Sequence, residues 1–479
     1  MRICIYAFST TALFFRALVD LFRAEGDDIE WSVIFPQGNF RRSMMDIIPA
    51  EQTCYLYENF RRRYNEVDSR AIQDGMGTGE GLVTALMKDK GGYRFLEKNE
   101  QLRRAATMHV IYEQFLRRIK PDYILLPNVE ATDGFVLLNI CRKLGIEVLY
   151  TVSYRMFGGS FFAPDPYETL PSYFGGYTSD DLTAARLAIG RFLGRKSPFV
   201  DEEDAHQMPP KPSVLYRAVA NFWIWWRYER LHASEETVIN RVRRNLRPLA
   251  EALRHAWFET MAVRYFDRFT PEHLPSPYIF YALHFTPETS INGLEPYYVD
   301  QLRAVDALLL NLPKGMWLVV KEHPSMVGRR PLAFYRTLRR RPGLILLHPC
   351  IDSRKLVAGA SLVATVTGTV GLESYLLGKP CIMFGPSFFA HLCVRAPALA
   401  ELRQRMEQSI ASYTAPSEAE KEREVAKLLN IGGAFDIWDP YWSPAVLAPN
   451  RVRAARDLVA RHIARLCEVR RLGLGPKEL

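Results

Sequence analysis

Short apolar runs alternate with longer amphipathic stretches from the start of the chain to about residue 175. Runs such as "RICIYAFS", "DYILLPN" and "EVLYTVS" have the length and β-branched content of strands. Between them, stretches such as "TALFFRALVDLFRAEG" and "HVIYEQFLRRIK" repeat apolar residues at helical spacing. Strands that alternate with helices indicate a parallel α/β sheet. We therefore predict a first Rossmann-like domain over residues 1–175.

The strand pattern then stops and later returns. Helical periodicity, as in "EETVINRVRRNLRPLAEALRHAWF", predicts a helical insert or connector over 176–272. Over 273–400 the runs "YIFYALHF", "MWLVVKEHP" and "SLVATVTG" predict a second Rossmann-like domain, and 401–479 is expected to be a helical extension. The predicted fold class is α/β, with two Rossmann-like domains facing a cleft, where such domains bind ligands at the carboxyl ends of their strands.

Composition limits the compartment and the kinds of partner that the protein can have. The chain has 479 residues, 48% of them apolar, which is enough for two cores. Its seven cysteines are scattered, with no CxxC pair and no histidine at metal-ligand spacing, so we expect a reducing compartment and no structural zinc. The net charge of +9 favours anionic partners such as nucleotide phosphates, but because it is spread along the chain we expect no nucleic acid partner.

No apolar run reaches the roughly 18 residues that a membrane span needs. The aromatic run from Phe222 to Trp226 is more typical of a buried helix seam than of a membrane anchor, because alternating arginine and glutamate follow it. We therefore predict a cytoplasmic protein, a location that leaves room for peripheral contact with the inner face of the cytoplasmic membrane.

Two strands of the second domain end in residues that suit an anion. After "MWLVV", Lys321 and His323 can donate hydrogen bonds to phosphate oxygens, and Pro324 fixes the turn that aims them. After "YIFYAL", His284 and then Glu288 come before the next helix. Polar residues also end most strands at a protein surface, so position alone leaves both interpretations open.

A third strand, in "SLVATVTGTVGLESYLLGKP", breaks into Thr367, Gly368 and Thr369 before a helix. Free N–H groups at a helix start carry partial positive charge, glycine allows close approach of a phosphate, and threonine hydroxyls add donors. Glu373, one turn inside, can accept hydrogen bonds from ribose hydroxyls. The alternative is a simple cap with a first-turn acid, each stabilising the helix by about 1 kcal/mol or less.

The first domain offers carboxylates after its own strands. In "DYILLPNVEATDG", Glu130 and Asp133 lie at a strand-to-helix crossing and suit a general base, because one carboxylate can stay ionised while the other orients it. The alternative is capping by Asp133 and a solvated Glu130. Arg155 and Asp165 follow in "TVSYRMFGGSFFAPDPYETLP", a stretch suited to acceptor binding. The glycines of "DGMGTGEG" follow polar residues rather than a strand, so we discount them as a dinucleotide loop.

In order and spacing, "LHFTPETS", "VVKEHP" and "HPCIDSRKLVAGASLVATVTGTVGLESYLLGKPCIMFG" resemble the capsule and surface-polysaccharide biosynthesis proteins. These are bacterial glycosyltransferases of the two-Rossmann (GT-B) type, related to the Kdo and nonulosonate transferases. The resemblance covers 277–390 well and 1–175 weakly. It implies that 1–175 holds the acceptor and that 273–400 binds the nucleotide-sugar, with the donor phosphate bound by the His-Pro turn and the hydroxyl-rich helix start. The residue patterns and the resemblance together predict the substrate-binding residues Arg155, His284, Glu288, Lys321, His323, Pro324, Ser353, Thr367, Gly368, Thr369 and Glu373.

The resemblance leaves the catalytic base open. Related sialyltransferases use an acidic pair followed by glycine, and "EATDG" matches that pattern loosely, so the candidates are Glu130, Asp133 and Asp165. The predicted function is transfer of a sugar from a nucleotide-sugar donor, with a CMP-sugar favoured, to a hydroxyl of a surface or capsular polysaccharide or its lipid-linked precursor.

We expect no metal and no other cofactor in this reaction. Cationic side chains and a helix start can take the charge of the leaving phosphate, and no DxD-like motif follows a strand. The alternatives are a sugar-nucleotide epimerase, a polyol-phosphate transferase of similar fold, or a non-catalytic scaffold of polysaccharide assembly.

Overall fold

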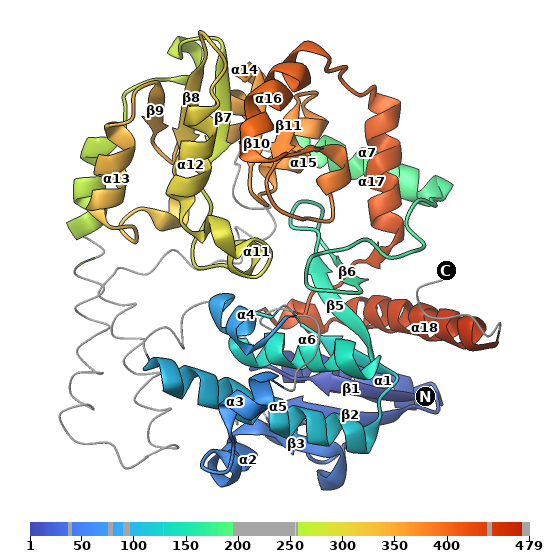
Figure 1. Ribbon diagram of the computed structural model, residues 1–479. Coiled ribbons are helices and arrows are strands. Elements are labelled where there is room, and N and C mark those ends of the chain that lie inside the picture. The colour runs from blue at the N-terminus through green and yellow to red at the C-terminus, as the bar shows by residue number, and fades with distance from the viewer. Residues whose placement is uncertain are drawn as a thin grey trace.

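The chain forms two α/β lobes, one above the other in Figure 1. The lower lobe holds the N-terminal strands and the upper lobe the second sheet, which confirms the predicted α/β class. The computed structural model describes residues 1–36, 41–74, 80–89, 96–127, 129–194, 254, 257–437 and 443–471.

The first sheet has the strand order β13-β6-β5-β4-β1-β2-β3. Strands β1 to β5 are parallel, β6 is antiparallel to β5, and β13 is antiparallel to β6. The order therefore reverses between β1 and β4, where open α/β sheets bind their ligands. The strands are β1 (Arg2–Tyr6), β2 (Glu30–Phe35), β3 (Thr53–Tyr55), β4 (Tyr123–Leu126), β5 (Glu147–Ser153), β6 (Ser160–Ala163) and β13 (Gly432–Gly433).

Apolar side chains cover both faces of this sheet. Ile3 and Ile5 of β1 pack toward α1 and α18, whereas Cys4 and Tyr6 pack toward α5 and α6, because successive residues of a strand point to opposite faces. The described helices of this lobe are α1 (Thr11–Ala24), α2 (Leu56–Arg63), α3 (Ser69–Asp74), α4 (Leu82–Met87), α5 (Lys98–Ile119), α6 (Thr132–Leu144) and α18 (Pro449–Arg471). Helices α7 (Ser179–Gly194) and α17 (Glu418–Asn430) lie beside the second lobe (Figure 1).

The second sheet is parallel throughout, in the order β12-β11-β10-β7-β8-β9. Its order reverses between β7 and β10, so both sheets have the strand order of a Rossmann fold. Helices α12, α13 and α16 cover one face, and α14 and α15 cover the other. The strands are β7 (Tyr278–Ala282), β8 (Trp317–Lys321), β9 (Leu344–Leu347), β10 (Leu362–Thr365), β11 (Cys381–Met383) and β12 (Val394–Arg395). The helices are α11 (Thr289–Asn292), α12 (Gln301–Leu310), α13 (Leu332–Arg339), α14 (Ser353–Gly359), α15 (Val370–Leu376) and α16 (Leu402–Ala411).

The last part of the chain returns to the first lobe. Helix α17 packs on α7, and α18 runs along the lower lobe beside α1 (Figure 1). The two-residue strand β13 extends the first sheet, although the sequence pattern of 401–479 predicted helices alone. The lobes also share an apolar contact, because the ring of Phe388 lies 6.0 Å from that of Tyr154 and 5.6 Å from that of Phe161.

The predicted insert over 176–272 is described only at its two ends. It begins with α7, whereas most of it, including the aromatic run Phe222 to Trp226, lies outside the described residues. Within the part of the chain that the structure describes, none of the helices has the length and apolar character needed to cross a membrane.

Candidate active site

The carboxyl ends of β7, β8 and β10 meet at the reversal point of the second sheet. His284 follows β7, Lys321 ends β8 with His323 two residues on, and Thr367 follows β10. The fold therefore brings together the three strand ends that the sequence predicted as phosphate-binding. A Rossmann-type sheet binds its ligand at this edge.

His284 is buried and uncharged. The N–H of Val366 donates to its Nε2 at 3.2 Å, and because a backbone N–H can only donate, the neutral ring carries its hydrogen on Nδ1. Burial lowers the pKa of His284 to about 3, and the charge of Arg330 contributes. The hydrogen bonds that the His284 ring makes to Thr365 and Val366 both involve Nε2. His284 is therefore a neutral donor at the end of β7.

His323 is a second neutral histidine. Its Nδ1 accepts a hydrogen bond from the N–H of Ser325 at 3.2 Å, which caps the 3₁₀ helix Pro324–Met326 and leaves the ring hydrogen on Nε2. Burial lowers the pKa of His323 to about 4, assisted by the positive charge of Lys321. In the described part of the chain Nε2 contacts no acceptor. Pro324 begins the 3₁₀ helix that holds the His323 ring in this orientation.

Lys321 supplies the positive charge of this edge. Its Nζ donates to the hydroxyl of Ser353 at 2.7 Å. Burial lowers the pKa of Lys321 to about 8, while the carboxylates of Glu373 and Asp352 favour the charged form. Three predicted residues therefore lie in one cluster: Lys321 at the end of β8, Ser353 at the start of α14 and Glu373 in α15.

The helix start after β10 is partly used by the protein itself. The hydroxyl of Thr367 donates to the carbonyl of Ser290, and the N–H of Gly368 donates to Oγ1 of Thr365 at 3.0 Å. Thr369 is the N-cap of α15 but makes no side-chain capping bond. A Cβ on Gly368 would lie 3.0 Å from Cε1 of His284, so the glycine allows this segment to lie against the imidazole.

A buried ion pair braces these strand ends. Nε of Arg330 lies 2.9 Å from the carboxylate of Glu322, and the two side chains are 6% and 0% exposed. Arg330 also donates to the carbonyl of His284 and, at 3.2 Å, to the hydroxyl of Thr286. Glu322 in turn accepts from the N–H of His323 at 2.6 Å. Sequence reasoning missed Arg330, because no local pattern pairs it with Glu322.

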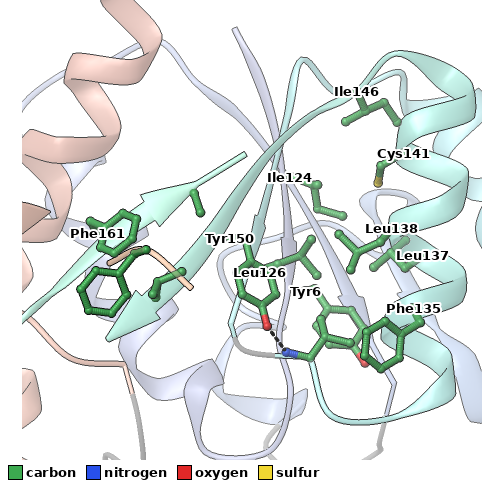
Figure 2. Packing of buried hydrophobic residues seen from close by; sticks show 14 of the residues in the cluster. Tyr6, Ile124, Leu126, Phe135, Leu137, Leu138, Cys141, Ile146, Tyr150 and Phe161 are labelled. Atoms are coloured by element: carbon green, nitrogen blue, oxygen red, sulfur yellow. Dashed lines mark hydrogen bonds between the residues drawn. The ribbon is translucent and has the colours of Figure 1, made fainter. Parts of the chain in front are cut away.

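Glu130 faces the cleft from the first lobe. The hydroxyl of Tyr150 accepts a hydrogen bond from the N–H of Val129 at 3.1 Å, which fixes the loop after β4; the dashed line in Figure 2 marks this bond. A Cβ on Gly134 would lie 2.4 Å from Cγ1 of Val129, so only glycine lets the loop pack against α6. The conformation of the Glu130 loop is therefore set by buried neighbours.

Asp133 and Asp165, the other two base candidates, each accept hydrogen bonds. The hydroxyl of Tyr6 donates to Asp133 at 2.7 Å, and burial raises the pKa of that carboxyl, with Asp89 adding in the same direction. Asp165 accepts from the N–H of Tyr167 at 2.9 Å and from the hydroxyl of Thr169 at 2.8 Å, so its carboxylate stabilises a turn.

Arg155 links the two lobes. It forms an ion pair with the buried Glu168 and donates to the carbonyl of Thr367 at 3.4 Å. Glu168 also accepts from the hydroxyl of Ser387 at 2.9 Å. Arg155 and Glu168 have φ values of +61° and +59°, a conformation that costs free energy outside glycine and that clusters at functional sites. Burial lowers the pKa of Arg155, whereas the charge of Glu288 raises it.

A cavity of about 110 Å³ lies between the lobes, with Glu130 and Arg155 on one side and Glu288 on the other. The side chain of Glu288 accepts from the hydroxyl of Ser290 at 2.6 Å, and its backbone N–H donates to Asn292. Because Arg155 also bonds to Thr367, the cavity adjoins the strand end next to His284. The lining residues are Glu130, Tyr150, Thr151, Val152, Ser153, Arg155, Pro166, Glu168, Glu288, Thr289, Ser290 and Leu294.

The chain is similar to a short part of one known protein and to distantly related solved structures. No family model matches the chain. Protein FixF of Sinorhizobium fredii is 29% identical over 130 residues, which is 26% of this chain and 30% of FixF. The match therefore spans less than a third of that relative.

Among solved structures, a UDP-GlcNAc 2-epimerase of Methanocaldococcus jannaschii, in complex with UDP-GlcNAc and UDP, is 12% identical. The comparison covers 90% of this chain and all of that one, with a TM-score of 0.27. The KpsC β-Kdo 2,4 transferase of Thermosulfurimonas dismutans is 14% identical, with 70% of this chain and 86% of that one covered and a TM-score of 0.35. Kdo transferases, which the sequence resemblance named, are thus among the similar structures. TM-scores of this size carry no argument about function, and the fold assignment here depends on the strand orders.

Proposed function

We propose that the protein is a GT-B glycosyltransferase of capsule or surface-polysaccharide biosynthesis that uses a nucleotide-sugar donor. The observation that carries the proposal is that phosphate donors of the second lobe lie at a strand edge next to a cavity shared with the first lobe. Lys321, His323 and His284 stand at the carboxyl ends of β7 and β8, and the cavity is lined by Glu130 of the first lobe and by Glu288, Thr289 and Ser290, which follow His284 in the second.

The proposed reaction is a displacement at the anomeric carbon. The acceptor hydroxyl gives its proton to Glu130 while its oxygen forms a bond to that carbon. The bond from the anomeric carbon to the phosphate oxygen breaks, and its electron pair goes to the phosphate. Lys321 and the ring N–H groups of His323 and His284 stabilise the charge on the leaving phosphate. Glu373, near Lys321, is suited to accept hydrogen bonds from a ribose.

Glu130 is the base we favour among the three carboxylates of the first lobe, because it lines the cavity. Asp133 and Asp165 are not among the lining residues. The acceptor would be a glycan or a lipid-linked glycan. We expect transfer to persist in EDTA, because the charge of Lys321 and the ring N–H groups of His284 and His323 can stabilise the leaving phosphate without a metal.

A thermal-shift screen with CMP, CDP, UDP and GDP tests the donor site. One of the nucleotides, with CMP expected, should raise the melting temperature, since a ligand that binds only the folded state stabilises it by about 2.7 kcal/mol at 100 times its Kd. His323→Ala should lose that shift, whereas the surface variant Glu30→Gln should keep it. If no nucleotide changes the melting temperature, the proposal fails. Product analysis then separates a transferase, which needs an acceptor to consume donor, from an epimerase.

Nucleotide affinity should fall as the pH rises above about 8. The pKa of Lys321 is lowered to about 8, so its charge is present below that pH and is lost above it. His284 and His323, with pKa values near 3 and 4, are neutral throughout the range from pH 6 to 10 and add no dependence there. Calorimetry from pH 7 to 9.5 should show weakening toward a limit of about tenfold per pH unit. Lys321→Arg, which stays charged, should flatten the profile, and a wild-type affinity that is constant to pH 9.5 would contradict the assignment.

A further inference from the structure

Glu168 is a buried carboxylate of the first lobe whose two oxygens are bound from different lobes. Oε1 forms an ion pair with Arg155 of the same lobe. Oε2 accepts from the hydroxyl of Ser387 at 2.9 Å and from the N–H of Phe388 at 3.3 Å, and both of these residues follow β11 in the second lobe. Three donors therefore already bind this carboxylate, which suits it to hold other groups in place rather than to take a proton from a substrate.

Arg155 extends this network to the strand edge that carries the phosphate donors. Its Nη1 donates to the carbonyl of Thr367 at 3.4 Å, while Nη2 pairs with Glu168. Thr367 lies in the turn between β10 and α15, and the next residue, Gly368, packs against the ring of His284. One chain of hydrogen bonds therefore connects the loop after β11, through the first lobe, with the turn beside the donors. We call this chain the interlobe contact.

The first lobe holds Glu168 in a fixed turn. Asp165 accepts from the N–H of Tyr167 and from the hydroxyl of Thr169, so its carboxylate spans the residue between them. The hydroxyl of Tyr167 accepts in turn from the buried ammonium of Lys88 at 2.7 Å. Glu168 has a φ of +59°, a conformation that persists only where its surroundings enforce it. The first lobe therefore fixes the carboxylate, and the second lobe must lie close for its bonds to form.

Cohesion of the lobes alone does not require these polar groups. The rings of Tyr154 and Phe161 already pack on that of Phe388. A buried ion pair adds little net stability compared with apolar side chains of similar size, because its charges lose their hydration. Its hydrogen bonds are directional, however, and favour one arrangement of the groups that they join. The interlobe contact is therefore suited to set the geometry of the site.

We propose that Glu168 is a positioning residue of the nucleotide site: by binding Arg155 and the loop at Ser387 together, it holds the Thr367 turn in its binding conformation. Nucleotide binding and formation of the interlobe contact are then coupled, so that each favours the other. This inference rests on the proposed function and adds the means by which the first lobe acts on the donor site.

Calorimetry with CMP, CDP, UDP and GDP measures this coupling. Ser387→Ala removes one bond between the lobes and should weaken binding of the nucleotide that the wild type binds at least about fivefold, the lower end of typical coupling. Ser409→Ala is the matched control, because both serines are 8% exposed but the hydroxyl of Ser409 donates to the carbonyl of Arg405 within α16. This control should bind as the wild type does. Equal affinities of the two variants would overturn the inference.

Hydrogen exchange on the full chain distinguishes positioning from a merely structural role. In the wild type, bound nucleotide should slow exchange in peptides covering 384–392, since the N–H of Phe388 donates to Glu168 across the lobes. Glu168→Gln offers one acceptor oxygen and an amide that only donates, so it cannot replace both carboxylate oxygens. Saturating nucleotide should no longer slow exchange in these peptides of that variant. If bound nucleotide leaves this exchange unchanged in the wild type, the contact supports the fold alone and the inference is wrong.

The two proposals can fail separately. If a nucleotide binds the wild type, and Ser387→Ala and Glu168→Gln bind it equally well, Glu168 does not position the site and the transferase assignment stands. If none of the four nucleotides binds the wild type, the donor site itself is wrong and the inference falls with it.

Discussion

Replacement of Glu130 by glutamine is expected to lower kcat for sugar transfer about 10²- to 10⁴-fold, the contribution typical of a general base. Glutamine keeps the shape of the side chain but does not take the proton of the acceptor hydroxyl. KM for the donor should change little, because the proposed phosphate contacts belong to the other lobe. Both constants are measured in steady-state assays with a glycan acceptor and a sugar donor that carries the nucleotide identified by the thermal-shift screen.

The same assay distinguishes the three carboxylates. Asp165→Asn should mainly reduce stability, because that carboxylate holds a turn through Tyr167 and Thr169. Asp133→Asn replaces a buried carboxyl that accepts a hydrogen bond from Tyr6 and whose pKa is raised by burial. It should leave kcat close to the wild-type value if Glu130 is the base. If Glu130→Gln retains kcat within about threefold while Asp133→Asn loses it, the base is Asp133 and the reaction takes place nearer β1.

The strand ends of the second lobe were the most predictable part of the site. An apolar run followed by "KEHP" or "TGT" marks a strand's carboxyl end locally, and the Rossmann order then places such ends side by side. The sequence alone could not distinguish residues that donate hydrogen bonds to a phosphate from residues that only cap a strand or a helix. The bonds of His284 and His323 fix which ring nitrogen carries the hydrogen, and both depend on backbone N–H groups placed by the fold.

Long-range pairs were beyond prediction for a physical reason. Arg155 contacts Thr367, more than 200 positions away, and Glu168 reaches Ser387 at a similar separation. Neither contact produces a periodic pattern in the sequence, because each depends on one side chain in a loop. Asp165 did carry a local signal, since Asp-Pro followed by threonine is typical of a turn held by the aspartate side chain.

The buried pair Arg330 and Glu322 should give the largest stability effect in the second lobe. Arg330→Met leaves the carboxylate of Glu322 buried without its counter-charge, at an expected cost of about 3–5 kcal/mol in the free energy of unfolding. Burial already raises the pKa of Glu322, and loss of Arg330 raises it further. The cost should therefore be smallest at low pH, where Glu322 is protonated, and should grow as the pH rises through the raised pKa.

Denaturant unfolding of the single and double variants measures this coupling. Glu322→Leu combined with Arg330→Met should recover most of the lost stability, because two apolar side chains of similar volume replace a desolvated ion pair. Nucleotide binding should stay impaired in the stable double variant, since Arg330 also holds the carbonyl of His284 and the hydroxyl of Thr286. A double variant that regains both stability and nucleotide binding would show that the pair supports the fold alone and does not position the phosphate donors.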